Sequence, residues 1–75
     1  MKQYRDLNRN SGIDSYELKP DSIIIKFKTG EEYLYNHHKP GKGKVETMKE
    51  LAEQGSGLTT FINKNIRDDY AKKLS

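Results

Sequence analysis

The segment HHKPGKGK, residues 37–44, holds the densest run of side chains in this sequence that could do chemistry. It contains two histidines and three lysines, and it contains no acidic residue. Lysine and protonated histidine attract phosphate and carboxylate groups, and an ordinary histidine gains its charge at about pH 6.5. The segment therefore predicts a surface that attracts anions; the alternative is a flexible, solvated loop. The cations concerned are His37, His38, Lys39, Lys42 and Lys44.

The GKGK portion of this segment does not match a nucleotide-binding phosphate loop. Such a loop needs a serine or threonine after its lysine, but Val45 follows Lys44, and His38 stands where the first glycine is required. Gly43 and Lys44 nevertheless lie at the expected start of a helix, where free N–H groups and the helix dipole favour anions. The sequence therefore indicates anion binding here without the phosphate-loop signature.

Two tyrosines lie on the strand candidate that precedes this segment. Tyr33 and Tyr35 are two residues apart, so both side chains point to one face of an extended strand. Exposed tyrosines beside lysines can stack on nucleic-acid bases, and each stack is worth about 1–3 kcal/mol by alanine substitution. The alternative is that both are core residues, because the chain has only two phenylalanines.

Four further cations are expected on or near the same surface. They are Lys26, Lys28, Lys64 and Arg67. For Arg67, a structural ion pair with Asp68 or Asp69 is the alternative to a phosphate contact.

The residues needed for catalysis or metal binding are missing or wrongly spaced. The chain has no cysteine, and its serines lie in no nucleophile-elbow motif. Glu31 and Glu32 are neighbours on a strand, so their side chains diverge and cannot act as an acid–base pair. His37 and His38 diverge in the same way and have no further ligand at helical spacing. We therefore expect no enzyme activity, no metal and no cofactor.

Three predicted strands precede the basic segment or run into it. Residues 13–19 alternate at Tyr16 and Leu18, and residues 22–28 contain a β-branched run that favours the extended state. Residues 31–36 form the return strand of a hairpin. Pro-Asp and Thr-Gly turns separate the three segments, which predicts an antiparallel meander.

The register of the second hairpin decides which side chains of the return strand face the core. Ile23, Ile25 and Phe27 share one face of their strand. Their cross-strand partners are either the two tyrosines or Leu34, and a shift of one residue exchanges these sets. The sequence leaves both registers open.

Two amphipathic helices are expected after the basic segment. In residues 45–55, Val45, Met48 and Leu51 share a face, and Gly55 permits the left-handed conformation that ends a helix. Apolar residues again repeat every three to four positions from Leu58 onward. The predicted fold class is α+β: a three-stranded antiparallel meander followed by two helices packed on one face, with the other face left to solvent.

Length and composition allow one small domain. The chain has 75 residues, and we expect a flexible arm over residues 1–10 followed by a single domain over residues 11–72. The longest apolar run is three isoleucines, and no apolar stretch follows the N-terminal charges, so we expect a soluble cytoplasmic protein with no membrane partner. The net charge of +3 suits an anionic partner without requiring one.

Three motifs give the chain a resemblance to a known family. They are Ser-Gly-Ile at residues 11–13, the strand IIIKFKTGEEYLY with its central Tyr33-Leu34-Tyr35, and INKNIRDDY at residues 62–70. In this order and spacing the chain resembles the KTSC domain, a small bacterial module found alone or at the C-terminus of some lysyl-tRNA synthetases. This chain departs from the family pattern at Ile62, where phenylalanine is usual, and at Ala71, where proline is common. The resemblance implies RNA as a partner but assigns no binding residues.

These observations lead to two functional hypotheses. The first is a non-catalytic module that binds RNA or transfer RNA through the basic loop and the sheet edge. The second is a protein-interaction or homodimerisation domain that uses the uncovered sheet face around Ile24 and Leu34. Steep salt dependence of binding would favour the first hypothesis, and self-association in solution would favour the second.

Overall fold

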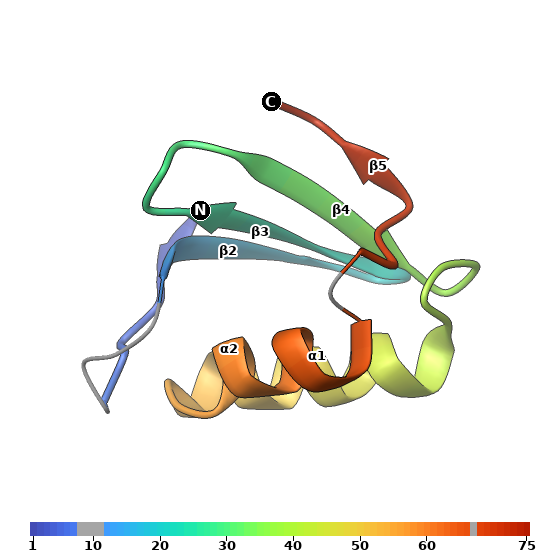
Figure 1. Ribbon diagram of the computed structural model, residues 1–75. Helices are drawn as coiled ribbons and strands as arrows, with labels where there is room; N and C mark the ends of the chain where they lie inside the picture. The colour runs from blue at the N-terminus through green and yellow to red at the C-terminus, as the bar shows by residue number, and fades with distance from the viewer. Residues whose placement is uncertain (8–11, 67) are drawn as a thin grey trace.

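The five strands of the structure form one antiparallel sheet in chain order. This computed structural model of the 75-residue chain describes residues 1–7, 12–66 and 68–75. Within these residues the strands follow one another across the sheet, and the helices lie on one side of it (Figure 1). The strands are β1 (Lys2–Gln3), β2 (Ile13–Lys19), β3 (Ser22–Phe27), β4 (Glu32–Asn36) and β5 (Lys72–Lys73).

The predicted α+β class is confirmed, and the predicted meander forms the centre of a larger sheet. Strands β2, β3 and β4 correspond to the three expected strands. The structure adds a two-residue strand at each edge: β1 pairs with β2, and β5 pairs with β4. The sequences of these short edge strands show no alternation of apolar and polar residues, because the strands are held by backbone hydrogen bonds and not by burial of their side chains. Short edge strands also limit unwanted pairing between chains.

The N-terminal residues belong to the sheet and the core. Lys2 and Gln3 pair with β2, and the Tyr4 side chain is only 4% exposed. The Tyr4 hydroxyl accepts a hydrogen bond from the Leu58 N–H at 3.3 Å, which joins the start of the chain to the second helix. Residues 2–4 of the expected arm therefore lie against the sheet and the core, and its last three residues lie outside the described part of the chain.

Helix α1 (Lys42–Gln54) buries the face that its spacing predicts. Val45, Met48 and Ala52 are buried. Gly55 ends the helix in the left-handed conformation, with φ 81°, and its N–H donates to the Leu51 carbonyl at 3.0 Å. This is the C-terminal glycine geometry expected from the sequence.

The second helix is shorter than the apolar spacing predicts. Helix α2 (Leu58–Phe61) continues as a π-helical segment, η1 (Ile62–Ile66), and the described chain then leads into β5. Asparagine and aspartate are poor helix formers and follow Ile62 closely. In this segment the Asn65 side chain donates to the Phe61 carbonyl at 3.2 Å. The π-helical spacing keeps Ile62 and Ile66 buried together.

The core lies between the sheet and the helices. In the β3–β4 pairing, Ile23 lies opposite Tyr35 and Ile25 lies opposite Tyr33. Opposite residues share a face, so both tyrosines are on the helix-covered side. No helix in the described ranges is long and apolar enough to cross a bilayer.

Candidate functional site

The predicted cations do not form one continuous surface. Lys28 follows β3 at the end of the sheet opposite the 37–44 segment, because Ser22 at the start of β3 pairs with Asn36. Six residues of extended chain separate Ser22 from Lys28, which corresponds to about 20 Å. The Lys28 ammonium also lies 3.4 Å from the Asp6 carboxylate. Lys26 lies on β3 with its side chain on the sheet face away from the helices, as alternation with buried Ile25 requires.

The two tyrosines do not form an exposed stacking platform. The Tyr35 side chain is 1% exposed, and burial raises the pKa of its hydroxyl, so Tyr35 has no free ring face for a base. Tyr33 is half-buried; its ring packs edge-on against Phe27, with 5.7 Å between ring centroids, and at a tilt against Tyr70, with 4.6 Å between ring centroids. The Lys73 ammonium lies 5.9 Å from the centre of the Tyr33 ring. The core interpretation is therefore correct for Tyr35, and Tyr33 belongs to an aromatic cluster.

The carboxylate nearest this cluster is Glu31. It accepts a hydrogen bond from the Tyr33 hydroxyl at 3.0 Å and lies 3.0 Å from the Lys73 ammonium. Hydrogen bonding to Lys73, then to Tyr33, lowers the pKa of the Glu31 carboxyl. The same hydrogen bond raises the pKa of the Tyr33 hydroxyl. These contacts attach the C-terminal strand to the β3–β4 hairpin.

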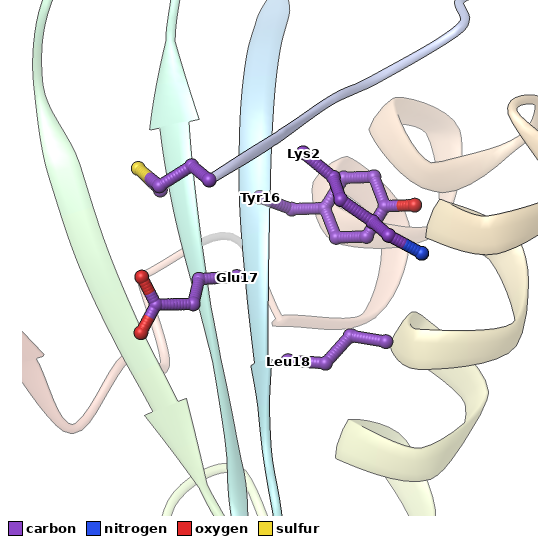
Figure 2. A pocket seen from close by; sticks show the side chains of 5 residues that line it. Lys2, Tyr16, Glu17 and Leu18 are labelled. Carbon is purple, nitrogen blue, oxygen red and sulfur yellow. The ribbon is translucent and has the colours of Figure 1, made fainter.

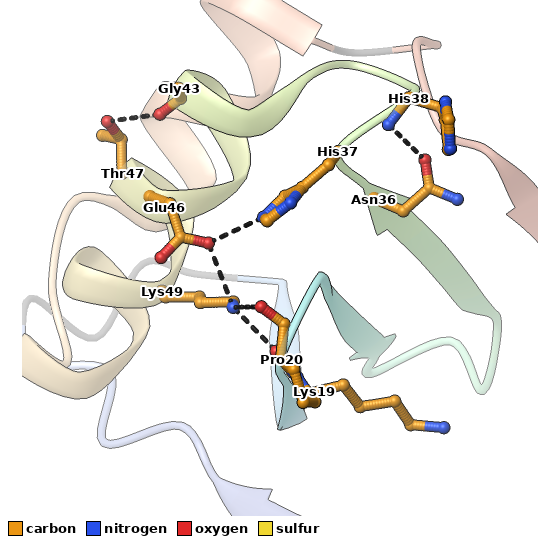
Figure 3. Close-up of polar contacts among 9 residues, drawn as sticks. All are labelled: Lys19, Pro20, Asn36, His37, His38, Gly43, Glu46, Thr47 and Lys49. Carbon is orange, nitrogen blue, oxygen red and sulfur yellow. Dashed lines mark hydrogen bonds and ion pairs between the residues drawn. The ribbon is translucent and has the colours of Figure 1, made fainter.

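His37 belongs to a chain of polar contacts that fastens α1 to the β2–β3 turn. Its Nε2 lies 3.0 Å from a Glu46 carboxylate oxygen, which in turn lies 3.0 Å from the Lys49 ammonium (Figure 3). Lys49 donates to the carbonyl oxygens of Lys19 at 2.7 Å and Pro20 at 3.2 Å. Hydrogen bonds from His37, then from Lys49, lower the pKa of the Glu46 carboxyl. The local role of His37 is structural, and its nearest charge is negative.

The other groups of the basic loop are divided between carboxylates and solvent. The Lys39 ammonium lies 3.9 Å from an Asp69 carboxylate oxygen. The His38 side chain is exposed, while its backbone N–H donates to the Asn36 side chain at 3.0 Å. Arg67, the last predicted cation, lies outside the described residues. No group of three or more histidine, aspartate or glutamate side chains within the described ranges is arranged to hold a metal ion.

Three lysines remain around the start of α1, and we call them the α1-start lysines: Lys42, Lys44 and Lys64. All three are exposed, and no ion pair between described residues includes them. The Lys44 ammonium reaches the Asn65 carbonyl at 3.5 Å, so Lys44 lies against the segment that carries Lys64. This smaller cluster is what the structure retains of the predicted basic surface.

The first turn of α1 has no side-chain cap. Gly41 precedes the helix and provides no side-chain cap, and the first turn contains no acidic residue. The first backbone bond of the helix runs from the Val45 N–H to the Gly41 carbonyl at 3.0 Å. The N–H groups of Lys42, Gly43 and Lys44 precede this bond and have no acceptor within the helix. They are available to water or to an anion.

The second candidate surface is the sheet face opposite the helices, which we call the outer face. Figure 2 shows Tyr16 and Leu18 directed toward the helices and Glu17 directed away from them. Glu17 lies opposite Ile24, Ile24 opposite Leu34, and Leu34 opposite Lys72. These four residues form a row across β2, β3, β4 and β5. Its two central members are apolar and half-buried, and its two ends carry opposite charges.

A second row on the outer face runs parallel to the first. Lys26 lies opposite Glu32 at its centre. At the β2 end, the Met1 sulfur lies 3.9 Å from the Ser15 hydroxyl; at the β5 end, the Leu74 N–H donates to the Glu32 carbonyl at 2.8 Å. Met1 and Leu74 are exposed large apolar side chains, at 55% and 41%. The sequence pattern did not identify either as a surface residue of interest, because the two edge strands that place them have no recognisable signature.

A shallow hollow adjoins the β2 edge of the outer face. It has a volume of about 500 Å³ and is lined by Met1, Lys2, Tyr16, Glu17 and Leu18 (Figure 2). It lies where β1 stops, because β1 pairs only with Ser15 and Tyr16. Its lining contains no arrangement of acid, base and nucleophile.

Comparison with known proteins adds no relative to this description. No family model, no curated protein and no solved structure matches the chain.

Proposed function

We propose that the chain is a non-catalytic interaction module that self-associates through the outer face. The observation that carries this proposal is the adjacent pair Ile24 and Leu34, which occupies the centre of a sheet face that neither helix of the described residues covers. Half-buried β-branched and aliphatic side chains at the centre of a face, with charges around them, resemble the apolar core and polar rim of a protein interface.

The size of the outer face limits the strength of such an association. Strands β2, β3 and β4 are five to seven residues long and the two edge strands have two residues each. With strands about 4.8 Å apart, the face covers roughly 350 Å² on each copy. Two such faces bury about 700 Å² in total, which places the interface in the weak, transient class. We therefore expect a dissociation constant in the micromolar range or weaker, with the dimer responding to local concentration.

Sedimentation velocity of the purified chain tests this proposal. Between about 10 µM and about 1 mM, a range that brackets such dissociation constants, the mean sedimentation coefficient is expected to rise from monomer toward dimer. A coefficient that does not rise over this range would contradict self-association.

A polyanion-binding function is the second candidate, and the α1-start lysines favour it. Acidic residues normally stabilise the first turn of a helix, because the helix dipole is positive there. In α1 this turn instead carries Lys42 and Lys44, together with the N–H groups that precede the first helical bond. These positive groups lower the stability of the helix and favour the binding of an external anion. The resemblance to the KTSC domain makes RNA the polyanion to test.

For this candidate, we expect Lys42→Glu/Lys44→Glu to weaken RNA binding by about tenfold or more, because each lysine that contacts a phosphate releases a counterion. We also expect the plot of log K against log salt concentration, between about 50 and about 200 mM, to become less steep. Its slope should fall in magnitude by about one unit for each phosphate contact that is lost. The matched control is Lys2→Glu/Lys28→Glu, which makes the same change in net charge on other parts of the surface. Equal losses in both variants would indicate attraction by net charge alone, and no RNA binding at low salt would exclude this function.

A further inference from the structure

The charges of the outer face change sign across its centre. On the β2–β3 half, Glu17 is negative and Lys26 is positive. On the β4–β5 half, the residues at the matching places have the opposite signs, Lys72 and Glu32. A line parallel to the strands and midway between β3 and β4 divides the two halves. A 180° rotation about an axis parallel to this line and above the outer face generates a second copy of the sheet. In that copy β4 lies over β3, and β5 lies over β2.

We propose that the outer face is covered by a second copy of this chain, related by a twofold axis that runs parallel to the strands between β3 and β4. This inference rests on the proposed self-association. It adds the relative orientation of the two copies and the residues that pair across the interface. The axis places Ile24 over Leu34 of the second copy and Glu17 over Lys72 of the second copy. It also brings Lys26 over Glu32 and Met1 toward Leu74. At these places each apolar group meets an apolar group, and each of the four named charges meets its opposite.

The alternative twofold arrangement brings like charges together. An axis perpendicular to the strands, along the row from Glu17 to Lys72, would place Glu17 over Glu17 and Lys72 over Lys72 of the second copy. Like charges facing one another across an interface cost free energy and select against that arrangement. Two sheets packed face to face also prefer strand directions within about 30° of each other, at a separation of about 10 Å. Both axes meet this preference, so the charges decide between them.

Glu17 and Lys72 are the pair that can test the arrangement, because they cannot meet within one chain. They lie on β2 and β5, three strand spacings apart, or about 14 Å. Within its own chain, the Glu17 carboxylate lies 3.8 Å from the Lys19 ammonium. Lys26 and Glu32 are unsuitable for this purpose, because they are cross-strand neighbours in the same chain.

The experiment compares Glu17→Lys and Lys72→Glu, each alone and mixed in equal amounts, by sedimentation velocity. Each variant alone opposes like charges at two symmetric places, so we expect its self-association to weaken about tenfold or more. In the mixture, Lys at position 17 of one chain faces Glu at position 72 of the other, and the second pair keeps its natural residues. The mixture is therefore expected to regain wild-type association. Thermal melts verify that both variants fold.

The control mixture uses Glu53→Lys and Lys64→Glu, which carry the same net charges but change exposed residues of the helical layer. We expect these two variants to associate like wild type, alone and mixed. If wild type associates but the Glu17→Lys and Lys72→Glu mixture is no tighter than either variant alone, the proposed axis is wrong and self-association stands. If wild type does not associate, the proposed function itself fails. Restoration in the control mixture as well would assign the effect to net charge and overturn the proposed pairing.

Discussion

Replacing Tyr35 with alanine is expected to lower the free energy of unfolding by about 3–5 kcal/mol, the usual cost of deleting a buried aromatic ring. The Tyr35 side chain is 1% exposed and lies opposite Ile23 in the β3–β4 pair. A domain of 75 residues has a total stability of only about 4–11 kcal/mol, at about 0.05–0.15 kcal/mol per residue. The variant is therefore expected to lose a large share of this stability, seen as a marked fall of the urea midpoint measured by circular dichroism.

The control for this experiment is Tyr35→Phe, which keeps the ring and removes only the hydroxyl. We expect it to remain folded, with a loss smaller than that of the alanine variant, because the packed volume is retained. If the alanine variant were as stable as wild type, the ring would have to lie on the surface. The core interpretation of Tyr35 would then be wrong.

Ile24→Lys is expected to abolish self-association while leaving the domain folded. In the monomer Ile24 is half-buried with neither described helix over it, so a lysine there can extend its ammonium group to water and costs little stability. In the dimer the same ammonium would be placed over Leu34 of the second copy, while its cross-strand neighbour Glu17 already faces Lys72 of that copy, which leaves the added charge without a partner of its own. Burying an unpaired charge costs far more than the association supplies. Sedimentation velocity should therefore show a monomer at every concentration tested.

Thr60→Lys provides the matched control for this variant, because it adds the same charge at an exposed position of α2. We expect it to associate as wild type does. Wild-type association of Ile24→Lys would show that the interface lies elsewhere, and equal loss in both variants would indicate general charge repulsion.

The sequence predicts the central meander and the buried face of α1 because both depend on side-chain periodicity. It leaves the β3–β4 register open, because a hairpin loop that is one residue longer or shorter changes the register. The predicted strand limits, 22–28 and 31–36, imply a two-residue loop. In the structure Phe27 donates to the Glu31 carbonyl at 2.8 Å, and Gly30 has φ 97°. The loop is therefore three residues long, with glycine in a left-handed position, as in the three-residue class of hairpins.

This difference of one residue decides the role of the tyrosines. A two-residue loop would place Leu34 opposite Ile25, whereas the observed loop places Tyr33 there. All side chains of β4 change faces between these two registers. Alternation of apolar and polar residues cannot separate them, because both faces of β4 carry large apolar side chains.

The basic surface could not be predicted because closeness in sequence does not fix closeness in space. The carboxylates that face His37, Lys39 and Lys28 belong to Glu46, Asp69 and Asp6. Two of these three come from parts of the chain more than twenty residues away from their cation, and only the tertiary fold brings them near. The outer face was partly predictable: Ile24 and Leu34 were recognised, while Lys72 and Leu74 depend on the edge strand that has no sequence signature.

The most direct measurement of the central claim is a map of amide chemical shifts during dilution from about 1 mM to about 10 µM, concentrations that span the expected micromolar dissociation. We predict concentration-dependent shifts at Glu17, Ile24, Leu34 and Lys72, with the amides of α1 unchanged. Shifts confined to the helical layer, or no shifts at any amide, would contradict self-association through the outer face.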